Sequence, residues 1–199
     1  IIEAVTENPE LKKKVLAEAD SHAKSDAIIA TNTSSISITE LASATRRPEK
    51  FAGMHFFNPP QLMKLIEIIR GAKTSDDTLN TIVEVTKRMG KEPVVCKKDV
   101  AGFVVHRVLI PALNEGIALV NEEVATPEDI DKAIKLGLNW PMGPLTLLDY
   151  VGLDTTLAIT EVMQEEIGQK YQANPLLRQM VRAGLLGRKT GKGFYDWKK

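Results

Sequence analysis

His55 and Glu67 are the residues whose types and spacing best fit acid–base chemistry. They lie in two apolar segments with strand-like patterns, 51–57 and 64–69, and the prolines between these segments cannot continue a ladder. Both residues are equally distant from Gln61 in the connection. If the segments form an antiparallel hairpin, the two side chains therefore sit opposite each other, with Cβ atoms about 5 Å apart.

A carboxylate opposite a histidine orients the imidazole and fixes its tautomer. Such a pair suits a general base that works near neutral pH. The same spacing is equally compatible with a half-buried hairpin in which His55 and Glu67 only satisfy each other. Spacing alone leaves both interpretations open.

Two other segments carry polar side chains that could bind a ligand. Residues 32–35 (Asn-Thr-Ser-Ser) follow an apolar strand pattern, and open α/β sheets bind ligands at the carboxyl ends of their strands. Turns and helix caps use the same residue types, and this is the better-supported reading of the segment by itself. Residues 187–195 are glycine-rich and basic, but no helix follows them as in a phosphate loop, so alone they predict a flexible tail.

The first half of the chain has the pattern of an α/β domain. Residues 1–5 predict a strand, and Asn8-Pro9-Glu10 starts a helix that carries Leu11, Val15, Leu16 and Ala19 on one face. A second strand follows at 27–31, which makes a parallel crossover unit. A short helix near 39–44, a helix at 78–89 and a strand at 93–96 accompany the hairpin segments.

The pattern changes after Asp99, where only helical periodicities remain. They cover 103–120, 126–136, 144–150, 154–167 and 175–183. The sequence therefore predicts an α/β domain over residues 1–99 and an all-helical domain over residues 100–199.

Composition excludes several function classes. Lys and Arg number 26 and Asp and Glu also number 26, so no excess positive charge is present to bind nucleic acid or an anionic membrane. The single Cys96 cannot form an intramolecular disulfide or a cysteine metal cluster, which fits a reducing, cytoplasmic location. No apolar stretch is long enough to span a bilayer. We expect no nucleic-acid partner, no membrane association and no bound metal.

Taken together, short blocks along the whole chain resemble the 3-hydroxyacyl-CoA dehydrogenases of β-oxidation and butanoate metabolism. The blocks occur in the family's order, at 32–35, 53–59, 63–67, 101–105, 141–144, 148–154 and 189–195. The resemblance implies a Rossmann-type NAD-binding domain followed by a helical C-terminal domain that forms a homodimer interface. It also implies NAD-dependent oxidation of (S)-3-hydroxyacyl-CoA to 3-oxoacyl-CoA, on short-chain substrates such as 3-hydroxybutyryl-CoA.

The resemblance assigns catalytic roles by position. His55 looks like the base that takes the proton of the 3-hydroxyl group, and Glu67 looks like the partner that stabilises the imidazolium. Ser34 matches a serine that contacts both the substrate and the nicotinamide ribose. Asn58 matches an asparagine near the nicotinamide.

Three charged residues match further cofactor contacts of the family. Glu7 and Lys12 follow the first strand of this chain, and Lys189 matches the lysine of a C-terminal segment that reaches back to the site.

His106 departs from the family pattern. The family phrase Gly-Phe-x-x-Asn-Arg has asparagine where this chain has histidine, in 102–107. The asparagine holds a substrate oxygen through its amide, and a neutral histidine can also donate one hydrogen bond. His106 therefore keeps the substrate-binding role, alters substrate choice or weakens catalysis. A packed histidine bonded to a backbone carbonyl is the alternative.

The family's Gly-x-Gly-x-x-Gly turn does not occur in this sequence. That turn belongs to a first crossover unit, which would precede Ile1. We therefore expect the chain to lack the N-terminal part of the NAD-binding domain and to bind NAD poorly, which would reduce or abolish its activity in isolation. Two alternatives remain: a non-catalytic dimerisation module of the same family, and a sister dehydrogenase of the L-gulonate type.

Overall fold

The computed structural model describes residues 1–198, which form two compact units. The first unit is Ile1–Val104, and the second begins at Val105. The predicted order of an α/β part followed by a helical part is confirmed.

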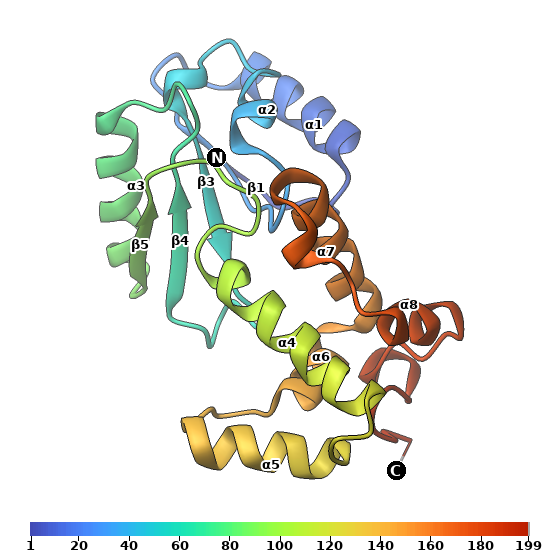
Figure 1. Cartoon of the computed structure of the whole chain (residues 1–199). Helices are drawn as coiled ribbons and strands as arrows, with labels where there is room; N and C mark the ends of the chain where they lie inside the picture. The colour runs from blue at the N-terminus through green and yellow to red at the C-terminus, as the bar shows by residue number, and fades with distance from the viewer. Residues whose placement is uncertain (199) are drawn as a thin grey trace. The chain divides into compact units, whose positions relative to one another are not determined.

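A five-stranded sheet forms the centre of the first unit (Figure 1). Its strands lie side by side in chain order, and β1 to β3 run parallel. β4 is antiparallel to β3 and parallel to β5. The strands are β1 (Ile2–Glu3), β2 (Ile29–Thr31), β3 (Phe51–Phe56), β4 (Leu65–Ile69) and β5 (Glu92–Cys96).

Three helices accompany the sheet: α1 (Pro9–His22), α2 (Ile38–Ala42) and α3 (Asp76–Arg88). Each begins after a polar residue whose side chain accepts a hydrogen bond from a backbone N–H of the first turn: Asn8, Ser37 and Ser75, respectively. The parallel pairing of β1 with β2 around α1 confirms the predicted crossover unit.

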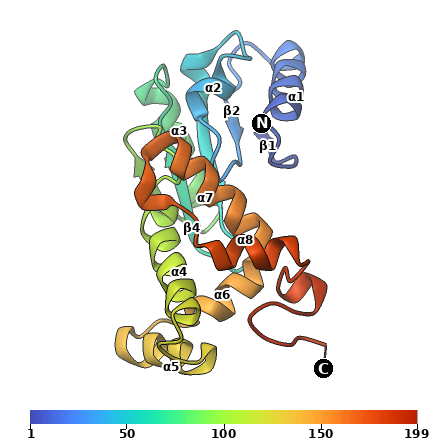
Figure 2. The same cartoon turned by 45° about the vertical axis from the view of Figure 1, so that its right-hand side comes forward.

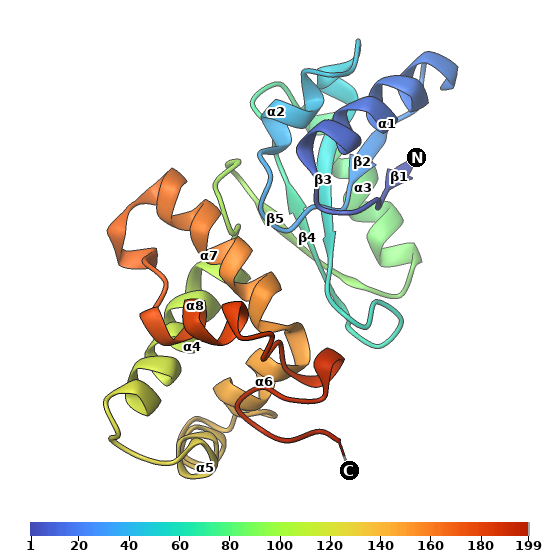
Figure 3. The same ribbon diagram turned by 90° about the vertical axis from the view of Figure 1, so that its right-hand side faces the viewer.

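Alternating strand residues build two cores, one on each face of the sheet. α1 and α2 contribute to one core, together with Phe51 and Ile69. α3 contributes to the other, together with Ala52 and Ile68 (Figure 3). By this alternation His55 shares the α1–α2 face with Phe51.

The buried face of α1 differs from the predicted one. Of the four apolar residues expected there, only Leu16 is buried, and Leu11 is 41% exposed. Lys12 and Asp20 are buried instead. Both charges have partners, since the Lys12 ammonium lies 3.0 Å from the Glu3 carboxylate and Asp20 binds two arginines. The spacing of apolar residues in a sequence does not predict a buried helix face whose charged residues form ion pairs.

The second unit consists of helices (Figure 2). Thr126 caps α5, because its hydroxyl accepts from the Asp129 N–H. The helices are α4 (Val105–Asn121), α5 (Pro127–Leu138), α6 (Pro144–Val151), α7 (Leu153–Ile167) and α8 (Pro175–Arg182).

α6 contributes Leu145 and Leu148 to the core of the second unit, where both are fully buried. The N-terminus of α6 is held by Asp131 of α5, whose carboxylate accepts from the N–H groups of Leu145 and Thr146 at 2.8 Å each. Asp131 also accepts from the Tyr195 hydroxyl at 2.9 Å. Burial, reinforced by this hydrogen bond, raises the pKa of the Tyr195 phenol well above its usual range.

The glycine-rich segment 187–195 is folded against α6, so the flexible tail predicted from this segment alone is wrong. The buried carboxylate of Asp149 accepts from the N–H groups of Phe194 and Tyr195 and from the Trp197 indole at 2.8–2.9 Å. Gly193 approaches so closely that an added Cβ would lie 2.0 Å from an Asp149 oxygen. Glycine here permits close packing rather than mobility.

Residues 1–198 contain neither a membrane-spanning helix nor a cluster of metal-ligating side chains. No helix in this range has the length and hydropathy needed to cross a bilayer. No group of three or more His, Cys, Asp or Glu side chains in the same range is arranged to hold a metal ion.

Gly53→Ala tests the close approach of α2 to β3. A Cβ at position 53 would lie 2.8 Å from Ile38 Cδ1 and 2.9 Å from Ile69 Cβ. We expect a loss of about 1–3 kcal/mol in unfolding free energy, measured by urea denaturation. The control is Gly137→Ala in α5, where no atom lies within 4 Å of an added Cβ. Equal stability of the two variants would contradict the packing argument.

Asp20→Asn tests the charged face of α1. Desolvation would raise the pKa of Asp20, but hydrogen bonds from Arg46 and Arg47 outweigh it and hold the pKa below its usual value. The ionised carboxylate therefore stabilises the fold above pH ~4, and this contribution is lost as the pH falls. We expect the substitution to lower the free energy of unfolding by about 1–3 kcal/mol at neutral pH and by less in acid.

Urea unfolding across this pH range measures the effect. Asp26→Asn is the control, because Asp26 is exposed and lies in the turn between α1 and β2. A destabilisation of Asp20→Asn that does not shrink in acid would contradict the assignment.

Candidate active site

The structure brings His55 and Glu67 together as the spacing predicts. They are paired residues of the antiparallel strands β3 and β4. His55 Nδ1 lies 2.9 Å from Glu67 Oε2, and the two residues are only 3% and 0% exposed. A carboxylate buried to this degree needs partners, because an isolated charge would carry a large desolvation cost. His55 is one of those partners.

The other Glu67 oxygen accepts a backbone hydrogen bond. The N–H of Val104 donates to Glu67 Oε1 at 2.9 Å. The neighbouring Phe103 ring meets the imidazole edge-on, with ring centroids 5.5 Å apart, and the Phe57 ring lies at 4.6 Å. Segment 100–104, assigned by sequence to the helical domain, thus packs in the first unit.

Ser34 reaches the other nitrogen of the imidazole. Its hydroxyl oxygen lies 3.2 Å from His55 Nε2. An ionised Glu67 can only accept, so the partners assign the proton of the neutral ring to Nδ1. Nε2 then accepts from the Ser34 hydroxyl. A lone pair at Nε2 is what a general base needs.

Glu7 holds the loop that carries Ser34. Its Oε1 accepts from the Thr33 hydroxyl at 2.6 Å and from the N–H groups of Ser34 and Ser35 at 2.8 and 3.1 Å. The Glu7 side chain remains 39% exposed. This carboxylate binds the loop that carries Ser34 and still faces solvent.

Lys12 does not have the environment expected of a direct cofactor contact. Its side chain is 0% exposed, and its ammonium group binds Glu3, the carbonyls of Val5 and Asn32 and, at 3.7 Å, Glu7. Through these contacts Lys12 supports Glu7 and the surrounding loops, and its role as a cofactor contact stays a prediction.

Asn32 has a supporting role that sequence analysis did not identify. Its side-chain oxygen accepts from the Phe56 N–H at 3.0 Å, which ties the 32–35 loop to β3 next to His55. The signal was its position directly after a strand, but the same position also fits an ordinary turn. Asn58, two residues beyond β3, is exposed.

His106 and Lys189 belong to the second unit. His106 lies half-buried in the first turn of α4. The Lys189 ammonium donates to Asp154 at the start of α7, a partner not identified from the sequence. Desolvation would raise the pKa of Asp154, but the hydrogen bond and charge of Lys189, together with backbone hydrogen bonds, outweigh it and lower the pKa below its usual range.

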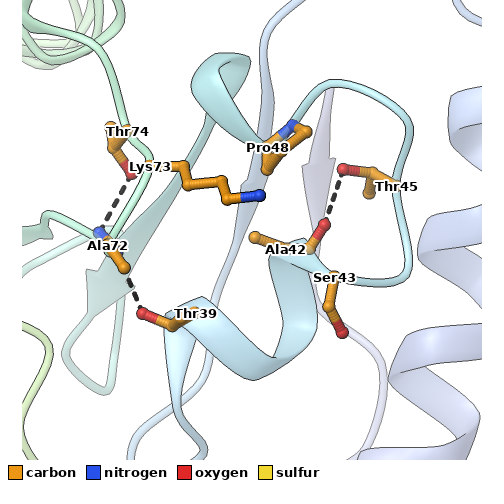
Figure 4. Close-up of a pocket in the computed structure, with 9 residues that line it drawn as sticks. Thr39, Ala42, Ser43, Thr45, Pro48, Ala72, Lys73 and Thr74 are labelled. Carbon is orange, nitrogen blue, oxygen red and sulfur yellow. Dashed lines mark hydrogen bonds between the residues drawn. The ribbon is translucent and has the colours of Figure 1, made fainter.

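A separate cavity of about 290 Å³ lies between α2 and the β4–α3 connection (Figure 4). Thr39, Lys73 and Thr74 are among its lining residues, whereas His55, Glu67 and Ser34 are not. The Thr39 hydroxyl accepts from the Ala72 N–H across it at 3.0 Å. The cavity is therefore distinct from the candidate base.

Comparison with known families accounts for both units. The NAD-binding domain of 3-hydroxyacyl-CoA dehydrogenase matches residues 1–100, and the C-terminal domain of the same family matches residues 102–197. The chain belongs to the 3-hydroxyacyl-CoA dehydrogenase family. Members of this family are NAD-dependent oxidoreductases, which agrees with a buried His–Glu pair beside a serine.

Curated relatives are similar over the full chain. A probable 3-hydroxybutyryl-CoA dehydrogenase of Deinococcus radiodurans is 52% identical over 99% of this chain and 71% of its own length. The 3-hydroxybutyryl-CoA dehydrogenase of Clostridioides difficile is 53% identical over 100% of this chain and 71% of its own length.

A solved structure of (S)-3-hydroxybutyryl-CoA dehydrogenase from Ralstonia eutropha has the same fold. It superposes with a TM-score of 0.96 at 50% identity, covering 100% of this chain and 70% of that one. The matched region includes both units of this chain.

Proposed function

We propose that this chain oxidises (S)-3-hydroxyacyl-CoA to 3-oxoacyl-CoA with NAD, and that its substrates are short, such as 3-hydroxybutyryl-CoA. The observation that carries the proposal is the three-residue chain Ser34–His55–Glu67, which presents His55 Nε2 as a base. The printed names of the relatives from Deinococcus and Clostridioides support the short-chain substrate.

The residues around the base fit one end of the cofactor. Glu7, Ser34 and Asn58 follow the carboxyl ends of β1, β2 and β3, the edge at which parallel sheets bind nucleotides. None of the three is fully buried, so their polar atoms are accessible to a ribose or a carboxamide. When bound, NAD supplies the hydride acceptor.

His55 acts first as an acceptor of the substrate proton. Nε2 takes the proton of the 3-hydroxyl group as the C–O bond gains double-bond character. The imidazole then carries a positive charge 2.9 Å from Glu67 Oε2 in a buried site, where the attraction between the charges is stronger than in water. Glu67 thereby stabilises the charged ring and keeps Nε2 directed at the substrate.

Ser34 holds the oxygen on which the reaction occurs. Its hydroxyl lies at hydrogen-bond distance from Nε2, so a substrate oxygen that approaches this nitrogen also meets the serine. We infer that Ser34 donates to the substrate oxygen once that oxygen has given its own proton to His55. Positioning of this kind aligns the reacting groups before the chemical step.

We also propose roles for the second unit. His106 would donate a hydrogen bond to the acyl-CoA oxygen that asparagine binds in the family, and Lys189 would contact the cofactor. The helical unit would also form the interface of a homodimer, which sedimentation equilibrium tests directly.

The activity is tested in a version of the protein that carries the family's Gly-x-Gly-x-x-Gly turn, by NADH oxidation with acetoacetyl-CoA compared with NAD reduction by L-gulonate. We expect turnover with the thioester alone. We expect His55→Ala to lower kcat at least about 100-fold, because general base catalysis contributes factors of this size. The control is His22→Ala, since His22 is exposed on α1.

The results of these assays separate the proposed function from its alternatives. Turnover of L-gulonate in place of the thioester would assign the chain to the sister activity. Saturable NADH binding, followed by fluorescence, would contradict a purely structural dimerisation module. A His55→Ala variant that stays close to the original kcat would remove His55 from the mechanism.

His106→Asn tests the departure from the family motif. Asparagine supplies the amide donor without the capacity to become positively charged. We therefore expect kcat/KM for acetoacetyl-CoA to rise by about 2- to 10-fold, a gain of less than ~1.4 kcal/mol in transition-state binding. Unchanged or lower activity would show that the histidine has a role of its own.

A further inference from the structure

We propose that Asp99 is a positioning residue for His55, acting through the segment 99–104. This segment, which we call the bracing segment, contacts the supports of both imidazole nitrogens. Asp99 binds the turn that follows Ser34, and Val104 binds Glu67. The kinetic part of the inference rests on the proposed function, but the structural part does not.

The first end of the bracing segment is fixed by the Asp99 carboxylate. Oδ2 accepts from the Ser37 hydroxyl and from the Thr39 N–H, each at 2.7 Å. Oδ1 accepts from the Ile38 N–H at 3.1 Å. These partners are about 60 residues away in sequence. The contact therefore joins the segment that follows β5 to the loop that follows β2.

The second end is fixed against Glu67 and the imidazole. Val104 N–H donates to Glu67 Oε1, while the buried Phe103 ring meets His55 edge-on. Phe103 adopts the left-handed conformation, with φ of 47°, directly after Gly102 with φ of 74°. A bulky residue rarely adopts this conformation, and its contacts on both sides hold it there.

The loop from Ser34 to Ser37, which Asp99 binds, is short and internally bonded. Ser34 is three residues before Ser37, and the Thr33 hydroxyl accepts from the Ile36 N–H at 3.0 Å. Glu7 binds the start of this loop and Asp99 binds its end. A displacement of the bracing segment therefore affects the serine on Nε2 and the carboxylate on Nδ1 together.

Helix capping alone does not explain the hydrogen bonds that Asp99 makes to the start of α2. Ser37 already caps α2, because its hydroxyl oxygen accepts from the Glu40 N–H at 3.1 Å. That same hydroxyl donates a hydrogen bond to the Asp99 carboxylate. Asp99 thus adds a link from the capped helix to the bracing segment.

The structural test uses Asp99→Asn and hydrogen exchange. The variant loses the charge and half of the acceptor capacity while keeping the side-chain shape. We expect amide exchange to accelerate at least about 10-fold at Ile38 and Thr39 and also at Val104, five residues beyond the substitution. Asp77→Asn is the control, because Asp77 lies in the first turn of α3 and outside the bracing segment.

An acceleration confined to Ile38 and Thr39 would reduce Asp99 to a local cap and overturn the proposal. Ser37→Ala provides a second variant if Asp99→Asn fails to fold. It removes one of the three bonds to Asp99 and also the cap of α2, and it leaves the carboxylate charged. We therefore expect a smaller acceleration at Val104, and exchange at this amide, which is outside the capped helix, is the one that counts.

The kinetic test separates positioning from general structural support. We expect Asp99→Asn to lower kcat at least about 5-fold with KM values for NADH and acetoacetyl-CoA changed less than about 2-fold, because the base is misaligned while binding groups persist. An unchanged kcat, or a loss that follows the fall in melting temperature, would contradict positioning. These assays use the version that carries the Gly-x-Gly-x-x-Gly turn. If its unsubstituted form has no turnover, the proposed function fails, and amide exchange still decides the bracing segment.

Discussion

The hydrogen bond between His55 and Glu67 is the interaction on which the rest of the site depends. It joins β3 to β4 at a buried cross-strand pair. A slip of one residue between these strands would move one side chain to the opposite face and leave a carboxylate buried without its partner. The strand register that positions the base is therefore also the register that the buried charge requires.

Carboxylates recur as the groups that fix loops in the first unit. Glu7 accepts from several N–H and hydroxyl groups of the loop that carries Ser34, and Asp99 accepts from the turn that follows it. A charged acceptor forms stronger hydrogen bonds to backbone N–H groups than a neutral one. Catalytic residues on loops can thus be held as closely as residues on strands.

The second unit uses the same physical device. Asp131 binds the first turn of α6, and Asp149 binds the segment 194–197 that returns to that helix. Gly193 allows this close approach, since any side chain there would overlap the Asp149 carboxylate.

The sequence by itself determined the order of elements, the His55–Glu67 pairing and the family. Apolar periodicity and turn residues are local properties, and residues equally distant from one turn must meet in an antiparallel hairpin. The tertiary structure alone decided that Lys12 is buried, that α1 turns a charged face inward and that 187–195 is folded. It also decided that Asp99 binds the turn after Ser34 and that Val104 binds Glu67. These outcomes depend on hydrogen bonds and ion pairs between residues far apart in the chain, which no local pattern encodes.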